Sequence, residues 1–246
     1  MGVIRTLWLG ARATLFWVGF ILTTAAYLFI LPVLAFYPYR VCYPVLKRWI
    51  DINLWWLNVC CDVDYRVLGR ENIPKDSAAI IMANHQSVWE TMAVAQIFPP
   101  LTWVLKKELF RIPVFGWGLK MARPVAIDRT AGRTAVEQVK IQGKDRLDEG
   151  IWIVVFPEGT RVKPGQRLRY RPGGAVLANY SCYPVVPVAH NSGASWPKQS
   201  YIKKPGTITV SIGKPIKTRG RSVDEILEQV ENWIESEKAG LVFEER

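Results

Sequence analysis

The chain has 246 residues, of which 50% are apolar and 11 are tryptophan, and its formal net charge at pH 7 is +11. This length accommodates one large domain, or one domain with an appendage. A basic, tryptophan-rich chain usually meets an anionic partner such as nucleic acid, lipid headgroups or a phosphorylated ligand. The sequence carries no RNA-recognition signature, and its apolar N-terminus favours lipid over nucleic acid.

The N-terminal region is the most apolar part of the chain. No charged residue lies between Arg12 and Arg40, and this run exceeds the roughly 20 residues that cross a bilayer core. A cleaved signal peptide is disfavoured, because the run is too long and no small-x-small site closes it. Pro32 and Pro38 are expected to interrupt a straight helix. We predict a membrane anchor here, and single-pass and monotopic arrangements are both open.

A second apolar stretch, residues 41–61, carries Lys47, Arg48 and Asp51 and predicts an amphipathic, interfacial helix. Basic residues flank both ends of the first run, so the positive charges predict no orientation. A two-helix element dipping into one leaflet would put all these charges on the same side. We therefore expect residues 1–62 to form a membrane-anchoring helical segment, followed by an α/β domain over residues 63–246.

The cysteine pattern favours neither zinc nor a disulfide framework. There is no C-x-x-C pair and no zinc-like spacing among the four cysteines, which are Cys42, Cys60, Cys61 and Cys182. Reduced, buried thiols are expected for the three near the anchor. With only two histidines in the chain, we expect no metal site.

From about residue 63 onward, β-like runs alternate with helical patterns. This alternation predicts an α/β fold, with a mixed sheet flanked by helices. The predicted strands are Ala78–Ala83, Ile151–Phe156, Val185–Ala189 and Thr207–Ile212. The predicted helices are Ser87–Ile97, Ala131–Glu149 and Val223–Glu237. Ser222-x-x-Glu225 opens the last helix as a capping box.

The segment NHQSVWE, residues 84–90, holds one of the two histidines. Positions 85 and 90 would lie roughly 140° apart on a continuous helix. If the two residues are partners, His85 must therefore lie before the helix and Glu90 in its first turn. Two interpretations are open from this pattern: a general base held by a carboxylate, or a helix cap formed by Ser87-x-x-Glu90. One carboxylate cannot readily serve both the start of the helix and the histidine. We therefore expect Ser87 to be the N-cap and Glu90 to orient His85.

The segment FPEGTR, residues 156–161, follows the most strongly β-like run in the chain. It predicts a carboxylate, a closely approachable backbone and a guanidinium at the carboxyl edge of a sheet, where α/β proteins commonly bind ligands. Gly159 lets a ligand approach the main chain, and Arg161 offers a bidentate fork for phosphate. A Pro-Gly turn with surface charges would give the same pattern, so both interpretations stay open.

Further basic residues precede and follow FPEGTR in the chain. They are Lys106, Lys107 and Arg129 before it, and Lys163, Arg167, Arg169 and Arg171 after it. Such a surface suits phosphates, anionic headgroups or the acidic face of a pantetheine carrier. A solvated loop is the alternative interpretation.

In chain order, these motifs resemble those of the glycerolipid acyltransferases, and within them the bacterial 1-acyl-sn-glycerol-3-phosphate acyltransferases. The pattern is H-x4-[D/E], then K-x-E-L…P-x-x-G…I-D-R, then F-P-E-G-T-R, then V-P-V. The matching residues are His85 and Glu90; Lys107, Glu108, Leu109, Pro113, Gly116 and Arg129; Phe156 through Arg161; and Val186, Pro187 and Val188. The resemblance covers roughly residues 80 to 190, and four ordered blocks are far more specific than any one. Glu90 stands where most members have Asp, so the role is expected to survive with altered geometry.

The resemblance implies transfer of a fatty acyl group from acyl-CoA or acyl-carrier protein to the 2-hydroxyl of lysophosphatidate, giving phosphatidate for phospholipid synthesis. It implies a bacterial cytoplasmic (inner) membrane location, with the active site on the cytoplasmic side. His85 would be the base and Glu90 its orienting carboxylate. Glu158, Gly159, Thr160 and Arg161 would bind the acceptor, with Lys107 and Arg129 as further phosphate contacts. A thioester is already activated, so no metal or other cofactor is expected.

Other functions remain open from the sequence. The acceptor could be another lyso-lipid, such as a lysophospholipid or lyso-ornithine lipid. A non-catalytic lipid-binding protein on the same scaffold would be marked by loss of the histidine or the carboxylate, and both are present. Serine hydrolysis through Ser87 is disfavoured, because no G-x-S-x-G elbow surrounds it. His190, after a predicted strand, is expected to be structural rather than a second acid or base.

Overall fold

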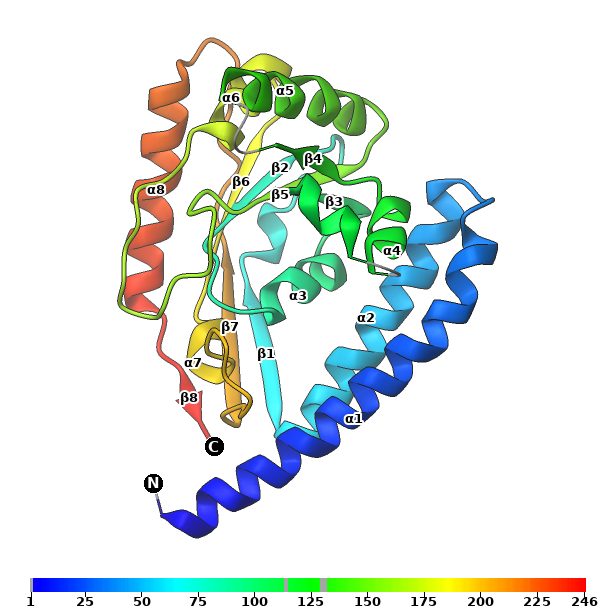
Figure 1. Ribbon diagram of the computed structural model, residues 1–246. Helices are drawn as coiled ribbons and strands as arrows, with labels where there is room; N and C mark the ends of the chain where they lie inside the picture. Colours follow the sequence, from blue (N-terminus) through cyan, green and yellow to red (C-terminus); the bar gives the residue numbers. More distant parts are fainter. Residues whose placement is uncertain (1, 113–114, 129–131) are drawn as a thin grey trace.

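The computed structural model describes residues 2–112, 115–128 and 132–246. Two long helices come first, α1 (Val3–Leu34) and α2 (Tyr39–Cys61), and they form a hairpin along one side of the molecule (Figure 1). The interruption expected at Pro32 falls two residues later, because α1 continues to Leu34. Proline lacks the N–H that would bond to the carbonyl four residues earlier and its ring crowds that carbonyl, and α1 ends within the same turn. Pro38 lies between the helices and is the N-cap of α2.

The two hairpin helices bury very different fractions of their surface. α2 buries one face along its whole length, as the amphipathic pattern predicts. α1 is the one helix in the described ranges that is long and apolar enough to cross a membrane. Only 11% of its most apolar 18-residue stretch is buried against the rest of the protein. Phe16 of α1 and Leu54 and Leu57 of α2 nevertheless belong to the same hydrophobic cluster as the sheet. The hairpin is therefore packed onto the α/β layers rather than tethered to them.

The sheet is mixed, as predicted, with the strand order β1-β7-β6-β2-β5-β3-β4 and β8 paired to β7. The β6–β7 and β7–β8 pairs are antiparallel and the other pairs are parallel. The strands are β1 (Val63–Leu68), β2 (Ile80–Ala83), β3 (Leu101–Lys106), β4 (Val125–Ile127), β5 (Trp152–Val155), β6 (Val185–His190), β7 (Gly206–Ile212) and β8 (Glu244–Glu245).

The four predicted strands are the buried strands of this sheet. Every residue of β2, β5 and β6 is buried, because helices cover both faces, and such strands read as continuous apolar runs. The strands that the pattern missed are β1, β3, β4 and β8. β1 alternates between buried and partly exposed residues, and β4 has only three residues, so neither gives a strong apolar run.

Helices lie on both faces of the sheet. α5, α6 and α8 lie on one face, and α2 and α3 lie on the other (Figure 1). The helices that follow the hairpin are α3 (Trp89–Ile97), α4 (Phe115–Met121), α5 (Arg133–Asp148), α6 (Gly173–Ser181), α7 (Ser192–Ser195) and α8 (Val223–Gly240), with 3-10 turns η1 (Arg70–Asn72) and η2 (Lys107–Arg111). The predicted capping box of α8 is confirmed, with reciprocal hydrogen bonds between Ser222 and Glu225.

The two ends of the chain lie close together (Figure 1). Arg5, near the start of α1, forms an ion pair with Glu245 of β8. Arg246 pairs with Asp62, which joins α2 to β1. The C-terminal tail therefore contacts the start of α1 and the residue that follows α2. All four cysteines are unpaired, and the three in the hairpin are buried as expected, whereas Cys182 is exposed.

Candidate active site

The candidate residues gather where three neighbouring strands end. β2 pairs in parallel with both β5 and β6, so the carboxyl ends of all three lie at one edge of the sheet. His85 follows β2, Phe156 follows β5, and Ser192 follows β6. This edge is where ligands bind in open α/β sheets. Segments that are far apart in the sequence thus meet through strand order alone.

His85 and Glu90 are in direct contact. His85 lies in the loop before α3, Glu90 lies in the first turn of that helix, and His85 Nδ1 is 2.7 Å from Glu90 Oε1. The arrangement deduced from their five-residue spacing is therefore present. The predicted cap is displaced by one residue: Val88 is the N-cap, and the Ser87 hydroxyl accepts the N–H of Trp89 at 2.9 Å.

The Glu90 carboxylate serves both the histidine and the start of the helix, contrary to expectation. Oε1 accepts from His85 and from the backbone N–H groups of Gln86 and Ser87, both at 2.8 Å. Oε2 accepts the hydroxyls of Ser87, at 2.5 Å, and Ser192, at 2.8 Å. Each carboxylate oxygen accepts more than one of these hydrogen bonds, so the same group serves the histidine and the helix start together.

These donors also set the charge of Glu90. The side chain is only 1% exposed, and burial alone would raise the pKa of its carboxyl group. The electrostatic interaction with His190 and the hydrogen bonds from His85 and Ser87 together outweigh burial and hold the pKa of Glu90 well below its ordinary value. Glu90 is therefore a buried anion beside Nδ1, where it fixes the tautomer with the proton on Nδ1.

The His85 ring is held on its face as well as on its edge. It stacks on the Phe156 ring, with centroids 4.2 Å apart and an interplanar angle of 15°. Its backbone N–H donates to Glu158 Oε2 at 2.8 Å, and its carbonyl accepts the N–H of Val162 at 2.7 Å. The side chain is 16% exposed, and Nε2 makes no hydrogen bond within the described parts of the chain. That nitrogen is the one open position of the ring.

Glu158 lies beneath the histidine loop rather than on the surface. Glu158 is 3% exposed. Burial raises the pKa of its carboxyl group to about 7, although the hydrogen bond from the His85 N–H lowers the pKa in part. Glu158 therefore changes charge near neutral pH. Its position shows that this carboxylate fixes the backbone of His85, a contact that the sequence pattern did not indicate.

Gly159, Thr160 and Arg161 turn away from β5 beside the histidine. Gly159 has φ +70°, a conformation that favours glycine, and an added Cβ would lie 2.8 Å from Arg171 Nε, so the Arg171 side chain would have to shift. Thr160 is exposed and Arg161 is partly buried. Arg161 accepts a hydrogen bond from Lys198 at its carbonyl. Its guanidinium has no ion pair with any described residue.

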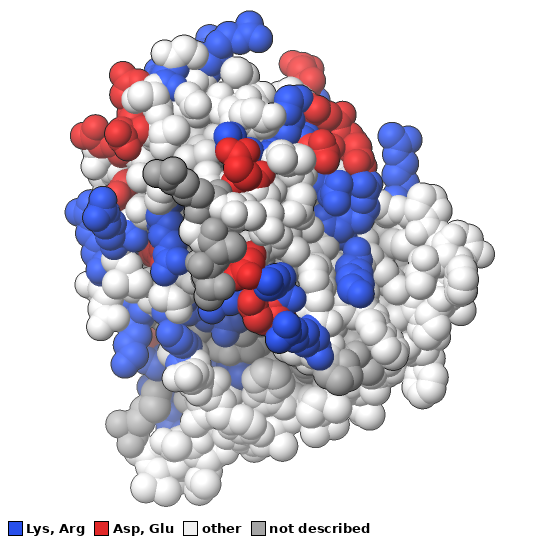
Figure 2. Space-filling view, turned by 45° about the horizontal axis from the view of Figure 1, so that its top comes forward, with Lys and Arg blue, Asp and Glu red and all other residues white. Residues whose placement is uncertain are grey.

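The remaining predicted contacts are less clearly placed at the site. Lys107 follows β3 at the same edge of the sheet, but its ammonium pairs with Asp128. Arg129 and Pro113 lie outside the described residues. Lys and Arg side chains are spread over the α/β part of the surface in Figure 2, whereas the margin formed by the hairpin is almost free of charge in this view. Residues 161–171 form a basic loop after β5. Arg167 of this basic loop pairs with Glu231 of α8 at 2.7 Å.

His190 and Asn84 connect the carboxyl ends of β6 and β2. His190 is 1% exposed, and its Nε2 lies 2.7 Å from the carbonyl oxygen of Asn84. A carbonyl only accepts, so Nε2 carries the proton. Burial lowers the pKa of His190, which favours this neutral form. The ring contacts backbone and is closed to solvent, the arrangement expected of a structural histidine. Sequence reasoning assigned no role to Asn84, although it opens the segment NHQSVWE, or to Ser192, which lies two residues after His190.

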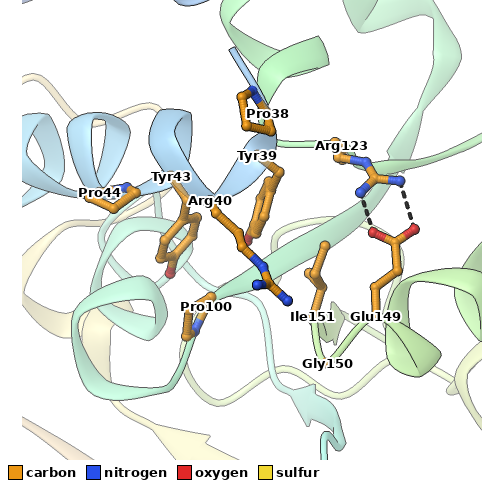
Figure 3. Close-up of a pocket in the computed structure, with 10 residues that line it drawn as sticks. All are labelled: Pro38, Tyr39, Arg40, Tyr43, Pro44, Pro100, Arg123, Glu149, Gly150 and Ile151. Atoms are coloured by element: carbon orange, nitrogen blue, oxygen red, sulfur yellow. Dashed lines mark hydrogen bonds and ion pairs between the residues drawn. The ribbon is translucent and has the colours of Figure 1, made fainter.

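A cavity of about 570 Å³ lies at the opposite edge of the sheet (Figure 3). Pro100 and Ile151, which line it, precede β3 and β5, whereas the histidine site lies after the strands. Arg40 and Tyr39 point toward it from α2, and Arg123 pairs with Glu149 at its rim (Figure 3). This cavity is separate from the candidate active site. No described group of three or more His, Cys, Asp or Glu side chains is arranged to hold a metal ion.

The sequence matches the profile of the family described as Acyltransferase over residues 64–191, which is more than half of the chain. The chain belongs to the acyltransferase family. The acyltransferase is 40% identical over 210 residues to the 1-acyl-sn-glycerol-3-phosphate acyltransferase of Pseudomonas aeruginosa, covering 84% of this chain and 80% of that protein. It is 29% identical to the enzyme of the same name from Saccharomyces cerevisiae, covering 76% of this chain and 63% of the yeast protein.

The fold of the acyltransferase is also shared with a solved structure. The crystal structure of the 1-acyl-sn-glycerophosphate acyltransferase PlsC from Thermotoga maritima matches it with a TM-score of 0.74 and 25% identity, covering 96% of this chain and 95% of that one. The match includes nearly the whole chain, so the leading helices belong to the shared fold. The resemblance deduced from four motifs is confirmed, and the protein is an enzyme that transfers acyl groups.

Proposed function

We propose that this acyltransferase moves a fatty acyl group from acyl-CoA or acyl-carrier protein to the 2-hydroxyl of 1-acyl-sn-glycerol-3-phosphate, giving phosphatidate. The observation that carries the mechanism is the 2.7 Å contact between His85 Nδ1 and Glu90 Oε1. It directs the proton to Nδ1 and leaves Nε2 as an acceptor. The acceptor specificity rests on the names of the relatives and on the cation at Arg161.

The chemistry follows from the position of that nitrogen. His85 Nε2 takes the proton of the 2-hydroxyl while the hydroxyl oxygen attacks the thioester carbonyl. A new C–O bond forms, the C–S bond breaks, and the proton passes from the imidazolium to the leaving thiolate. Glu90 stabilises the imidazolium that exists between these events. The thioester is already activated, so the step uses no metal and no covalent enzyme intermediate.

The loop after β5 supplies the acceptor site in this proposal. Val162 and Glu158 bind both backbone groups of His85, so the loop and the base keep a fixed relation. Arg161 lies between them in sequence, and its guanidinium suits the dianionic phosphate of the acceptor. Gly159 and Thr160 border the same turn. Lys107 and Arg129 stay predictions as further phosphate contacts, and Lys107 would have to leave Asp128.

The hairpin supports a monotopic membrane attachment. Leu9, Ala13 and Phe16 of α1 are buried against the rest of the protein, and α2 carries the Lys47–Asp51 ion pair beside it. A spanning α1 would draw this charged neighbour into hydrocarbon, which is costly. Lying in one leaflet, the helices keep their charges at the interface. We place the active site on the cytoplasmic face of the membrane, where acyl donors are found.

Large apolar side chains on the outer surface of the hairpin fit this attachment. They include Trp8, Leu15, Val18, Ile21, Leu22, Phe29, Val33, Phe36, Trp55 and Val59. Apolar surface of this extent on one element usually marks an interaction site. A lipid acceptor and a lipid product would then enter and leave within the leaflet, next to the catalytic edge of the sheet.

The test is product analysis with a panel of lyso-lipids and both donor types. Purified wild-type protein is expected to acylate 1-acyl-sn-glycerol-3-phosphate in preference to lysophospholipids and lyso-ornithine lipid. His85→Ala is expected to lower kcat by about 10²–10⁴-fold, the usual contribution of general-base catalysis, with the fold and membrane binding unchanged. Preference for an acceptor without a phosphate monoester would refute the acceptor assignment, and wild-type turnover by His85→Ala would refute the mechanism.

The phosphate assignment has its own test. Arg161→Ala is expected to raise the KM for lysophosphatidate about 10-fold or more, as for loss of a charge-assisted hydrogen bond, with little change in the KM for the acyl donor. Arg167→Ala is the matched control, because Arg167 lies in the same basic loop but pairs with Glu231. Equal effects of the two variants on the KM for lysophosphatidate would mean that the acceptor responds only to the overall positive charge of the loop, and would refute a direct contact with Arg161.

A further inference from the structure

The Ser192 hydroxyl lies against the Glu90 oxygen that does not contact His85. Ser192 is completely buried, and its Oγ is 2.8 Å from Glu90 Oε2 and 3.1 Å from Ser87 Oγ. It comes from α7, 102 residues further along the chain than Glu90. The sequence pattern assigned it no role, and the catalytic step as described does not use it.

The number of hydroxyl protons decides the direction of this hydrogen bond. Ser87 Oγ, Ser192 Oγ and Glu90 Oε2 form three mutual contacts, but only two protons are available. An ionised carboxylate oxygen can only accept. If Ser192 donated to Ser87, its 2.8 Å contact with an anionic oxygen would hold no proton and would be repulsive. Ser192 therefore donates to Glu90.

The fold brings Ser192 to this position through the ends of two strands. Asn84 Nδ2 donates to the His190 carbonyl at 3.0 Å, and Asn84 Oδ1 accepts the His190 N–H at 2.9 Å. On the other side of the contact, Gln86 Oε1 accepts the N–H of Gly193 at 3.0 Å. Two hydrogen-bonded bridges thus flank the Ser192–Glu90 contact, and they leave little freedom for α7 to move away.

A glutamate needs a second fixed point more than an aspartate would. Its extra methylene adds one rotatable bond, and each additional freedom weakens the positioning of the carboxylate. A hydrogen bond at Oε2 opposes rotation of the carboxylate away from Nδ1 of His85. We propose that Ser192 is a positioning residue, which donates to Glu90 Oε2 and so keeps Oε1 aimed at the histidine. The proposal rests on the His85–Glu90 mechanism given above.

The first experiment compares Ser192→Ala with Ser195→Ala. Ser195 is also a completely buried serine of α7, but its hydroxyl donates to the Lys204 carbonyl at 2.8 Å and does not contact Glu90. Ser192→Ala is expected to lower kcat about 10-fold, with both KM values within twofold of wild type. Ser195→Ala is expected to keep the wild-type kcat when assayed well below its melting temperature. Equal kcat values for the two variants would overturn the proposal.

A double-mutant cycle tests whether Ser192 acts through Glu90. In a Glu90→Gln background, the additional change Ser192→Ala is expected to alter kcat by less than twofold. A full 10-fold loss in that background would show that Ser192 acts elsewhere, for example on the substrate, and would overturn the proposal. The same series separates the two claims: if Glu90→Gln itself kept wild-type activity, the underlying mechanism would fail first.

A spectroscopic signature excludes a purely structural effect. The Nδ1–H proton of His85, identified by its loss in His85→Ala, reports the strength of the His85–Glu90 hydrogen bond. Its NMR resonance is expected to move in Ser192→Ala and to stay in place in Ser195→Ala. An unmoved resonance in a folded Ser192→Ala protein would overturn the proposal, even if its activity were reduced.

Discussion

Asn84 and His190 are joined by three hydrogen bonds across the ends of β2 and β6. The Asn84 side chain bonds both backbone groups of His190, and the His190 ring bonds the Asn84 carbonyl. The next residue along the chain from Asn84 is His85, and Ser192 lies two residues beyond His190. This connection therefore sets the distance between the two sides of the candidate active site.

The first prediction concerns the role of the second histidine. His190→Ala removes the donor to a buried carbonyl and leaves a cavity, so we expect a loss of about 2–4 kcal/mol in the free energy of unfolding. The Asn84 side chain still bonds the backbone at position 190, so kcat well below the melting temperature is expected to fall less than 10-fold. Thermal unfolding and single-temperature kinetics measure the two effects. A stable variant as inactive as His85→Ala would instead identify His190 as a second acid or base.

Glu90→Asp tests whether the longer carboxylate is fitted to this site. Shortening the arm by one methylene at a fixed helix start cannot preserve the contacts with both His85 and Ser192. A misplacement of about 1 Å in a catalytic group costs up to 10²-fold, and we expect kcat to fall roughly 10- to 100-fold. Glu225→Asp, in the remote capping box of α8, is the control. Undiminished turnover by Glu90→Asp would mean that α3 shifts to compensate.

Glu158→Gln is expected to change the pH dependence of acceptor binding. The raised pKa of Glu158, about 7, means that its negative charge develops near neutrality, three residues before Arg161, where we propose that the phosphate binds. For wild type, the KM for lysophosphatidate should therefore rise more steeply between about pH 6 and 8 than for the variant. The ratio of the two KM values cancels the titration of the substrate. A constant ratio would contradict the prediction.

The same substitution has a stability consequence with a definite sign. Because the folded-state pKa of Glu158 is raised from 4.5 to about 7, its contribution to stability is fully present below pH 4.5. It is lost as the pH rises through about 7. The difference in melting temperature between wild type and Glu158→Gln should shift in this direction across that range.

Lys203 offers a fourth prediction, because it is buried among the rings that join α1 to the α/β layers. Its Nζ lies 4.3 Å from the Trp17 ring centroid and 4.5 Å from that of Trp196. Burial lowers its pKa to about 8, so the charged form is disfavoured despite the rings. Wild-type stability should therefore rise as the pH increases from about 8 toward 10.5, where the unfolded lysine still holds its proton.

Lys203→Met keeps the length of the side chain and removes this titration. We expect the variant to be as stable as wild type or more stable at pH 7, and to lack the rise in melting temperature above pH 8. Thermal unfolding in detergent at several pH values measures both. A large destabilisation at pH 7 would mean that the cation–π contacts and the hydrogen bond from Nζ to the Tyr201 carbonyl together exceed the cost of burial.

The hairpin surface gives the fifth prediction. Phe36, in the turn between α1 and α2, is 89% exposed, and Phe36→Glu is expected to reduce binding to phospholipid vesicles at least severalfold, because it exchanges an apolar insertion for a charge. Ile141→Glu is the matched control, since Ile141 of α5 is also exposed, at 55%, but lies on the α/β part. Cosedimentation with vesicles compares them. Similar binding by both variants would refute membrane insertion of the turn.

Much of this protein follows from local sequence patterns. The buried strands, the long apolar helix and the capping box of α8 each depend on neighbouring residues. The strands and the capping box were predicted close to their observed bounds, whereas α1 begins nine residues before Arg12, where the uncharged run starts. The spacing of His85 and Glu90 also required a strand, a loop and then a helix, because five residues on one helix would separate them. The four ordered motifs were enough to identify the family.

Only the tertiary structure decided which distant residues share the site. Strand order places the ends of β2, β5 and β6 side by side, and no local pattern encodes that neighbourhood. The structure therefore showed that Glu158 holds the backbone of His85, and that Ser192 completes the contacts of Glu90. It also corrected the expectation that Glu90 could not serve two partners, since the number of donors around a carboxylate depends on how the chain folds around it.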